Sequence, residues 1–207
     1  MKRDPLENTQ RLYPIAEAQG GYFTAAQARE AGYTYAQQHF HVTRGNWLRV
    51  DRGIFRLPHF PPQLHEDLIC LSLWSRTQSG SPQAVVSYVT ALALHELSDI
   101  LPATVHLTVP PGFRKPAPSG CVLHRANLRP ADIEAHTGYR VTTPLRTLLD
   151  VAASPLSQEH LDQAVTEALA RGMVRREVLE DAAEASPVQA RLEQALAFAC
   201  ESLELSR

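Results

Sequence analysis

Two short segments, each bounded by a threonine and a glycine, constrain the fold of this chain more than any other feature. Thr24 opens the first segment and Gly32 closes it, while Thr34 opens the second and Gly45 closes it. A threonine hydroxyl accepts a hydrogen bond from a free backbone amide at the start of a helix, and glycine commonly follows a helix end because it adopts positive φ without strain. We therefore expect two short helices joined by a tight turn.

The pattern changes to alternation after the second segment. Leu48 and Val50 alternate with their neighbours, residues 51–53 are typical of a chain reversal, and residues 54–57 return as a second strand. The segment is therefore predicted to be a β-hairpin. Its exposed rim would carry three arginines, Arg49, Arg52 and Arg56.

Helix, turn, helix and basic hairpin in this order predict a winged helix-turn-helix in residues 1–58. The second helix of such a unit lies in the DNA major groove, and the hairpin would rest on the phosphate backbone beside it. We expect phosphate contacts from the arginines and base contacts from the second helix, since glutamine pairs with adenine and arginine with guanine. The predicted DNA-binding residues are Thr34, Tyr35, Gln37, Gln38, His41, Arg44, Arg49, Arg52 and Arg56.

Two alternatives stay open. The first concerns the rotation of the second helix: if Phe40 faces the core, His41 is exposed, whereas if His41 and Val42 pack inward, Gln37 and Phe40 turn outward. The second is that these residues form an ordinary α+β core whose arginines are a solvated face, or a module that docks proteins.

Charge is distributed unevenly along the 207 residues. The formal net charge is −2, but residues 1–58 carry eight Lys and Arg against five Asp and Glu, a net +3. Residues 151–207 carry five against ten, a net −5. This asymmetry suggests that a polyanion binds the N-terminal part and that the C-terminal part is free for another partner.

Prolines at positions 58, 61 and 62 separate the basic hairpin from the C-terminal part of the chain. Proline fits neither a helix interior nor a central strand, so we place the domain boundary between residues 58 and 59. Residues 59–207 mix short apolar strands with helices and become helical toward the C-terminus. The predicted fold class is α+β, with an N-terminal winged helix-turn-helix followed by a mixed α/β domain.

Hydropathy and cysteine spacing exclude several classes of protein. No apolar run approaches the roughly 18 residues of a membrane helix, and the N-terminus lacks the apolar core of a signal peptide. We therefore expect a cytoplasmic protein without a membrane partner. The cysteines at 70, 121 and 200 lack Cys-x-x-Cys spacing, so we predict neither a zinc site nor a disulfide framework, and expect buried apolar fillers.

Three of the nine histidines invite an enzymatic interpretation. His95, His106 and His124 could converge to bind zinc or act in acid–base chemistry. None has the i, i+4 or His-x-His spacing that places two ligands on one face. We therefore expect structural histidines that are hydrogen-bonded at the edge of the core.

Two further pairs of charged residues have both a functional and a structural interpretation. Arg146 and Asp150 are four apart on a predicted helix, and we expect a structural ion pair rather than a cleft. Arg114 and Lys115 lie on a proline-rich loop, where contact with phosphate and simple solvation are equally open.

Six blocks of the chain carry a resemblance to a known family. They are residues 23–32, 44–58, 86–99, 105–110, 124–125 and 141–150, for example Val-Thr-Thr-Pro-Leu-Arg-Thr-Leu-Leu-Asp in the last. In this order they resemble the AbiEi family, the antitoxins of bacterial abortive-infection toxin–antitoxin systems. The resemblance covers roughly residues 8–185, and the order of the blocks is more specific than any one of them.

The resemblance implies a transcriptional autorepressor of a type IV toxin–antitoxin system, acting in phage defence. Its winged helix would bind double-stranded DNA at its own promoter. Its remaining domain would counteract a nucleotidyltransferase-like toxin without a stable complex. Many relatives have no toxin gene beside them, so a solitary winged-helix regulator is an alternative.

The resemblance also bears on catalysis. Some longer relatives continue past a segment like residues 186–193 into an endonuclease-like domain, whereas this sequence ends at Arg207 after one more helix. The acidic pair and lysine that such a nuclease needs are missing, so we expect no enzyme, no catalytic residue, no metal and no cofactor. The rival hypotheses are a degenerate nuclease or metal-dependent hydrolase, and a protein-interaction adaptor.

Overall fold

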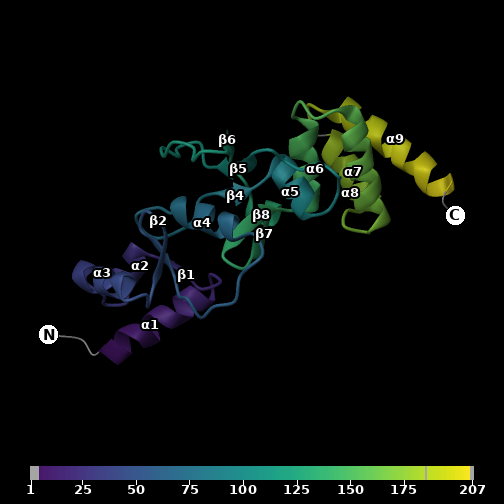
Figure 1. Ribbon diagram of the computed structural model, residues 1–207. Helices are drawn as coiled ribbons and strands as arrows, with labels where there is room; N and C mark the ends of the chain where they lie inside the picture. Colours follow the sequence, from purple (N-terminus) through teal and green to yellow (C-terminus); the bar gives the residue numbers. More distant parts are fainter. Residues whose placement is uncertain (1–4, 185, 206–207) are drawn as a thin grey trace. The chain divides into compact units, whose positions relative to one another are not determined.

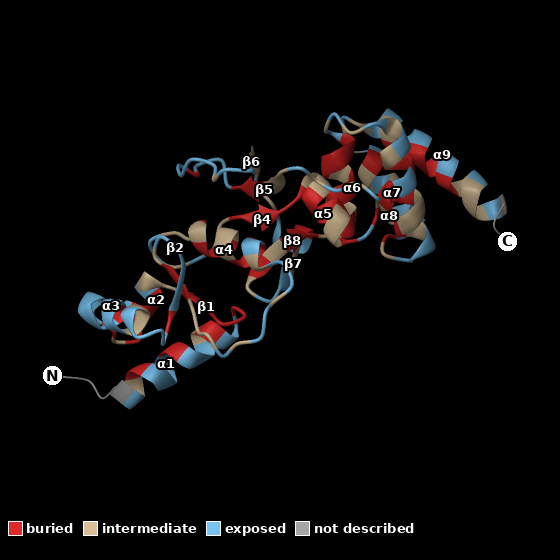
Figure 2. Ribbon diagram, viewed as in Figure 1, coloured by how far each residue is buried: buried red, intermediate tan, exposed pale blue. Residues whose placement is uncertain are grey.

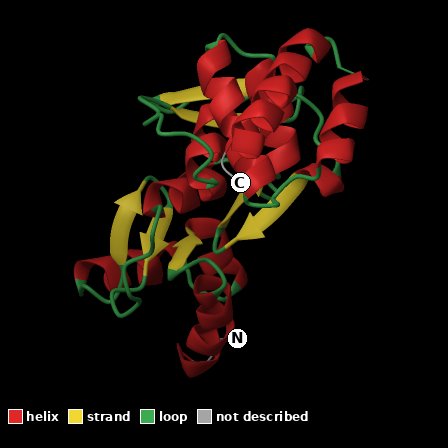
Figure 3. Ribbon diagram, turned by 90° about the vertical axis from the view of Figure 1, so that its right-hand side faces the viewer, coloured by secondary structure: helices red, strands yellow, loops and turns green. Residues whose placement is uncertain are grey.

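The computed structural model describes residues 5–184 and 186–205, and the chain divides into two compact units (Figure 1). Unit 1 comprises Met1–Ala84 with Ala135–Arg140, and unit 2 comprises Val85–Glu134 with Val141–Arg207. Helices and strands occur in both units (Figure 3). The predicted α+β class is therefore confirmed.

Unit 1 combines helices with a three-stranded antiparallel sheet of strand order β1-β3-β2. The sheet contains one strand that the sequence does not predict, because three residues are too few to show alternation. This strand, β1, pairs Phe23 with Phe55. The elements are α1 (Pro5–Glu17), β1 (Tyr22–Thr24), α2 (Ala25–Glu30), α3 (Tyr35–Thr43), β2 (Leu48–Asp51), β3 (Ile54–Arg56) and α4 (Glu66–Trp74).

Both predicted threonine caps are present, each in a reciprocal capping box. Thr24 Oγ1 accepts from the Gln27 amide at 3.2 Å, and the Thr24 amide donates to Gln27 Oε1 at 2.9 Å. Thr34 and Gln37 repeat this exchange at the start of α3. These bonds satisfy amides that helix ends leave free, so α2 and α3 begin where the sequence predicts.

An aromatic core holds the hairpin against the helices of unit 1. Trp47 packs edge-on against Phe23 at 4.8 Å between ring centroids and lies 5.7 Å from Phe55. Gly53 makes the reversal with φ of +72°, a conformation that favours glycine. Strand β2 is exposed along its whole length, so the alternation of Leu48 and Val50 does not mark a buried face: β2 is an edge strand.

A second sheet has five strands in the order β6-β5-β4-β8-β7 and is mixed. Its strand residues lie in unit 2 except for those within residues 135–140, which are counted with unit 1. Strand β4 pairs antiparallel with β5 and parallel with β8. Strand β6 is the predicted partner of β5 and runs parallel to it. The strands are β4 (Val85–Val86), β5 (Val105–Val109), β6 (Cys121–Arg125), β7 (Ile133–His136) and β8 (Tyr139–Thr142).

Beyond strand β8 the regular structure of the chain is helical, as predicted. Leu148, Leu161, Leu179 and Leu192 are fully buried in one core drawn from four different helices, and the buried colour in Figure 2 gathers along these helices. The helices are α5 (Tyr88–Leu94), α6 (Pro144–Ala152), α7 (Gln158–Ala170), α8 (Arg176–Glu184) and α9 (Gln189–Leu205), with a 3-10 turn at Pro130–Asp132.

The predicted boundary between residues 58 and 59 falls inside unit 1. Helix α4, which lies beyond this boundary, packs against β1 and β3, and its Glu66 forms an ion pair with Arg56 at 3.6 Å. Arg76 also donates a hydrogen bond to Gln19. The compact unit therefore extends to Ala84, while a division of function at residue 58 stays a prediction.

Candidate nucleic-acid interface

Helix α3 turns an aromatic and polar face to solvent (Figure 2). Tyr35 is 66% exposed and Phe40 is 52% exposed. Gln37, His39 and Arg44 are also exposed. Because Thr34 caps this helix and Arg44 ends it, the exposed face runs along the whole element.

The opposite side of α3 settles the helix rotation that the sequence leaves open. His41 and Val42 are half-buried, so Gln37 and Phe40 turn outward. The His41 ring stacks on Trp47 with 4.8 Å between centroids and 14° between planes, and its Nδ1 lies 3.2 Å from Asn46 Nδ2. Burial lowers the pKa of His41. The prediction of His41 as a base contact therefore does not fit its inward position.

The predicted base contact of Gln38 also needs correction, because Gln38 is only 4% exposed. Its Nε2 donates to the carbonyl oxygens of Ala25 at 3.2 Å and Tyr33 at 3.3 Å. Both of these carbonyls lie outside α3 itself. Gln38 thus ties α3 to the start of α2 and to the turn between them, and its amide is not free to bond a base.

Thr34 and Gln37 are exposed but already engaged with each other. Gln37 Oε1 accepts from the Thr34 amide at 2.8 Å and from Thr34 Oγ1 at 3.0 Å. A bidentate contact of glutamine with adenine uses this oxygen as well as the amide nitrogen. Gln37 therefore offers Nε2 alone while the cap is intact, and Thr34 acts as the helix cap.

The four predicted arginines fall into two groups. Arg44, Arg49 and Arg52 are exposed, and the structure gives none of them a carboxylate partner among the described residues. The Arg44 guanidinium lies over the Phe40 ring at 5.4 Å. These side chains are available to an anion.

Arg56 differs from the other three, because its side chain is 15% exposed. It donates to the Phe60 carbonyl oxygen at 2.9 Å, lies over the Tyr22 ring at 5.6 Å and pairs with Glu66. Its expected place on the exposed rim is therefore wrong. Arg56 instead joins the hairpin to the segment between β3 and α4.

A hollow of about 230 Å³ lies between α3 and the hairpin. Its walls come from both elements, with Tyr35, His39 and Val42 on α3 facing Arg49, Gly53 and Phe55. The exposed face of α3 and the hairpin thus border one concave surface. His39, which the sequence also offers as a groove candidate on the second helix, lines this hollow together with Arg49.

Unit 2 contains a chain of alternating charges around the predicted Arg146–Asp150 pair. Arg146 Nε donates to Asp150 Oδ1 at 2.8 Å, and its Nη1 lies 3.8 Å from Asp132 Oδ2. Arg129 completes the chain by donating to Asp132 at 2.8 Å. The predicted ion pair is confirmed, but it is largely buried, with Asp150 only 5% exposed.

The two carboxyls of this chain have opposite pKa shifts. Burial raises the pKa of Asp150 against the opposing effect of Arg146, and Asp150 Oδ2 has no hydrogen-bond partner among the described residues. The hydrogen bond from Arg129 lowers the pKa of Asp132. These four side chains form a structural network in which each charge is opposed by a neighbour.

The three candidate histidines also bond within unit 2. His95 is buried, and its Nε2 lies 2.7 Å from the Thr142 carbonyl oxygen. His106 Nδ1 lies 3.0 Å from His124 Nε2, and Tyr88 stacks on His124 at 3.6 Å. No group of three or more metal-ligating side chains occurs within the residues that the structure describes. The expectation of structural histidines agrees with these contacts.

The exposure of the proline-rich loop agrees with the sequence, whereas the burial of the cysteines differs from what we expected. Arg114 and Lys115 are exposed, as a loop tip predicts. Cys70, Cys121 and Cys200 form no disulfide among the described residues and are half-buried, so they are less buried than the apolar fillers that we expected. Burial nonetheless raises the pKa of Cys70 to about 11, which keeps this thiol protonated at neutral pH.

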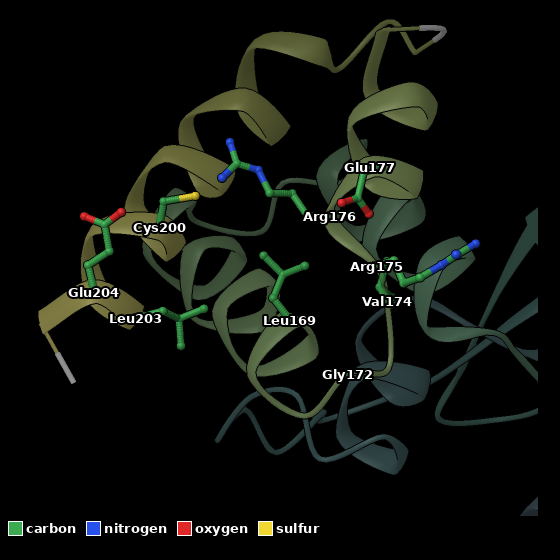
Figure 4. A pocket seen from close by; sticks show the side chains of 9 residues that line it. All are labelled: Leu169, Gly172, Val174, Arg175, Arg176, Glu177, Cys200, Leu203 and Glu204. Carbon is green, nitrogen blue, oxygen red and sulfur yellow. The ribbon is translucent and has the colours of Figure 1, made fainter. Parts of the chain in front are cut away.

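A further pocket of about 400 Å³ lies in the helical part of unit 2 (Figure 4). Leu169, Val174 and Leu203 give it an apolar lining. Arg176 extends toward α9 and Cys200, while Arg175 points the other way. Arg176 also forms an ion pair with Glu180 at 2.7 Å. Its charge is thus already opposed within the protein.

Comparison with known proteins places the chain in a family. A family model described as the AbiEi antitoxin C-terminal domain matches residues 84–197, which is most of unit 2 and more than half of the chain. No curated protein matches the chain. Among the described helices, none has the length and apolar character needed to cross a membrane. The chain belongs to the AbiEi antitoxin family.

Proposed function

We propose that this protein is a DNA-binding transcriptional autorepressor and the antitoxin of a type IV toxin–antitoxin system. Family membership supports an antitoxin or regulatory role in general. The DNA-binding part rests on one observation, the concave surface that the exposed face of α3 shares with the basic hairpin. We further propose that it acts in the cytoplasm on double-stranded DNA of its own promoter.

In this proposal residues 1–58 are a winged helix-turn-helix, with α2 and α3 as the helix pair and β2–β3 as the wing. The capping boxes support this interpretation because they define two short helices separated by one tight turn. Gln38 supports it as well, since its bonds to Ala25 and Tyr33 hold α3 against that turn. A rigid second helix is what base recognition needs.

The burial and contacts of the side chains revise the predicted roles. Tyr35, His39 and Arg44 are proposed to contact bases, with Gln37 contributing its free Nε2. Arg49 and Arg52 would neutralise phosphates. Thr34, Gln38, His41 and Arg56 instead position α3 and the hairpin.

Residues 59–207 are proposed to be the regulatory and antitoxin domain, counteracting a nucleotidyltransferase-like toxin without a stable complex. The AbiEi antitoxin family is generally non-enzymatic, and we propose no catalytic role here. The buried side chains of His95 and Asp150 are bonded to Thr142 and Arg146, which supports a structural role for both.

The base-reading role of α3 is tested with the full-length Arg44→Ala variant. Binding is measured by fluorescence anisotropy on the duplex upstream of its own gene and on a shuffled duplex. A lost bidentate contact should lower the preference for the upstream duplex by about 1–3 kcal/mol, with a smaller change on the shuffled one. Arg11→Ala is the matched control, since Arg11 is already paired with Glu7 at 2.6 Å. Equal losses on both duplexes would make Arg44 a phosphate contact.

The antitoxin half is tested by growth of cells that express the toxin from the neighbouring gene. Wild type and Arg44→Ala should both restore growth, because α3 serves the promoter in this proposal. Toxin and antitoxin should not co-elute from a size-exclusion column. A variant that loses both promoter binding and rescue would contradict the separation of the two activities.

A further inference from the structure

A small aromatic pocket lies in unit 1, apart from the exposed face of α3. Its volume is about 260 Å³. Tyr13 of α1 and His41 of α3 line it, together with Trp47 and His59. The pocket thus meets both the first helix and the inward side of the proposed recognition helix.

The lining favours a neutral, planar ligand. No Asp, Glu, Lys or Arg is among the lining residues, and burial keeps the pKa of His41 below its ordinary value. Tyr33 and Trp47 meet edge-on at 4.9 Å, while His41 stacks on Trp47. Aromatic walls of this kind bind ring systems through stacked and edge-on contacts.

Polar groups in the same lining favour a ligand with nitrogen or oxygen at its edge. Tyr33 and Thr9 share a hydrogen bond of 3.0 Å between their hydroxyls, and Asn46 bonds to His41. Trp47 also lines the pocket, and an indole N–H can only donate a hydrogen bond. An acceptor at the edge of the ligand would therefore suit this wall.

The volume limits the size of the ligand. An apolar cavity of about 150 Å³ holds benzene, so about 260 Å³ suits two fused rings rather than one. Drug-sized ligands occupy pockets of roughly 300–1,000 Å³, which lie above this volume. A bicyclic molecule fits best.

We propose that this pocket binds a neutral bicyclic nitrogen heterocycle, of which purine bases are one example, and that the bound ligand weakens DNA binding. The second half rests on the proposed function of α3. The ligand would touch His41 and Asn46, which lie on the last turn of α3 and in the turn to β2. It would also touch Trp47, whose ring packs against Phe55 of β3.

This position couples the ligand to the DNA-binding surface. Phe40 and Arg44 flank His41 on the same helix, so a ligand that displaces the His41 ring shifts the turn that carries both. A ligand changes a conformational equilibrium only through a difference in affinity for the two states. Here the two states would differ in the His41–Trp47 stack. The ligand would bind more tightly to the state in which its own ring extends or replaces this stack.

Binding is tested on the full-length protein, without DNA, by calorimetric titration with adenine, 7-azaindole and hypoxanthine. Ribose is the non-aromatic control. We expect saturable binding of at least one heterocycle, none of ribose, and a shift of the Trp47 indole N–H resonance. Tyr13→Ala should weaken binding about 2- to 10-fold, as one lost aromatic contact does. Tyr13 is 47% exposed, so this change leaves the core filled.

Tyr35→Ala is the matched control, because Tyr35 is exposed and does not line this pocket. It should leave heterocycle affinity unchanged. Absence of binding by all three heterocycles overturns the proposed site, as does equal weakening by Tyr13→Ala and Tyr35→Ala.

The effect on DNA is measured separately, by anisotropy with saturating heterocycle. We expect weaker binding of the upstream duplex in wild type and a reduced effect in Tyr13→Ala. Heterocycle binding with unchanged DNA affinity overturns the coupling and keeps the site. A protein that binds the heterocycle but no DNA contradicts the proposed function instead.

Discussion

Removal of the two unpaired hairpin arginines should change how DNA affinity depends on salt. Arg49 and Arg52 are exposed on the β2–β3 hairpin without a carboxylate partner among the described residues, so each is free to neutralise one phosphate. Each such contact contributes about −0.9 to the slope of log affinity against log salt. The full-length Arg49→Ala/Arg52→Ala variant should therefore have a slope shallower by up to about 1.8.

This change of slope is large enough to measure by anisotropy titration. Between about 50 and 200 mM salt, it corresponds to roughly tenfold less loss of affinity than in wild type. Circular dichroism should show an unchanged fold, since both side chains are exposed. Arg11→Ala serves as the control, because Arg11 is paired with Glu7 and should leave the slope unaltered. An unchanged slope in the double variant would refute the contact of the hairpin with DNA.

Three further predictions concern stability. Gln38→Ala should lower the free energy of unfolding in urea by about 1–3 kcal/mol, because it removes two hydrogen bonds that the buried Gln38 amide donates to the carbonyl oxygens of Ala25 and Tyr33. A neutral effect would contradict the role of Gln38 in holding α3. Thr34→Ala should lower the free energy of unfolding by about 1 kcal/mol through loss of the α3 cap. Thr34→Ser keeps a hydroxyl at this position and should retain most of that stability. Burial lowers the pKa of both His106 and His124, so the unfolded chain binds protons first and stability should fall as the pH drops below about 6.5. His124→Gln should flatten this pH dependence in unfolding titrations, and an unaltered profile would exclude the pair as its source.

Local signals predict the start of the helices in unit 1 because the bonds involved are themselves local. Thr24 and Thr34 each bond within three residues, so their positions in the sequence suffice. The apolar strands of unit 2 are predictable for a similar reason, since Val105, Leu107 and Val109 alternate along β5. Element type and order follow from such patterns.

The roles of individual side chains depend on contacts that no local pattern contains. Gln38 is buried because the carbonyls of Ala25 and Tyr33 lie beside it once the turn has formed. Arg56 is drawn inward by Phe60 and Glu66, which lie beyond the predicted domain boundary. A polar residue on a predicted recognition helix or wing is therefore only a candidate until its tertiary neighbours are known.

Competitive binding of the full-length protein to the duplex upstream of its own gene would show whether it recognises a DNA sequence. We expect this duplex to be bound more tightly than a shuffled duplex of the same length and composition, and we expect excess shuffled duplex to fail to displace it. Equal affinity for the two duplexes, or no binding of either at low salt, would contradict the proposal that α3 and the hairpin make this antitoxin a sequence-specific regulator.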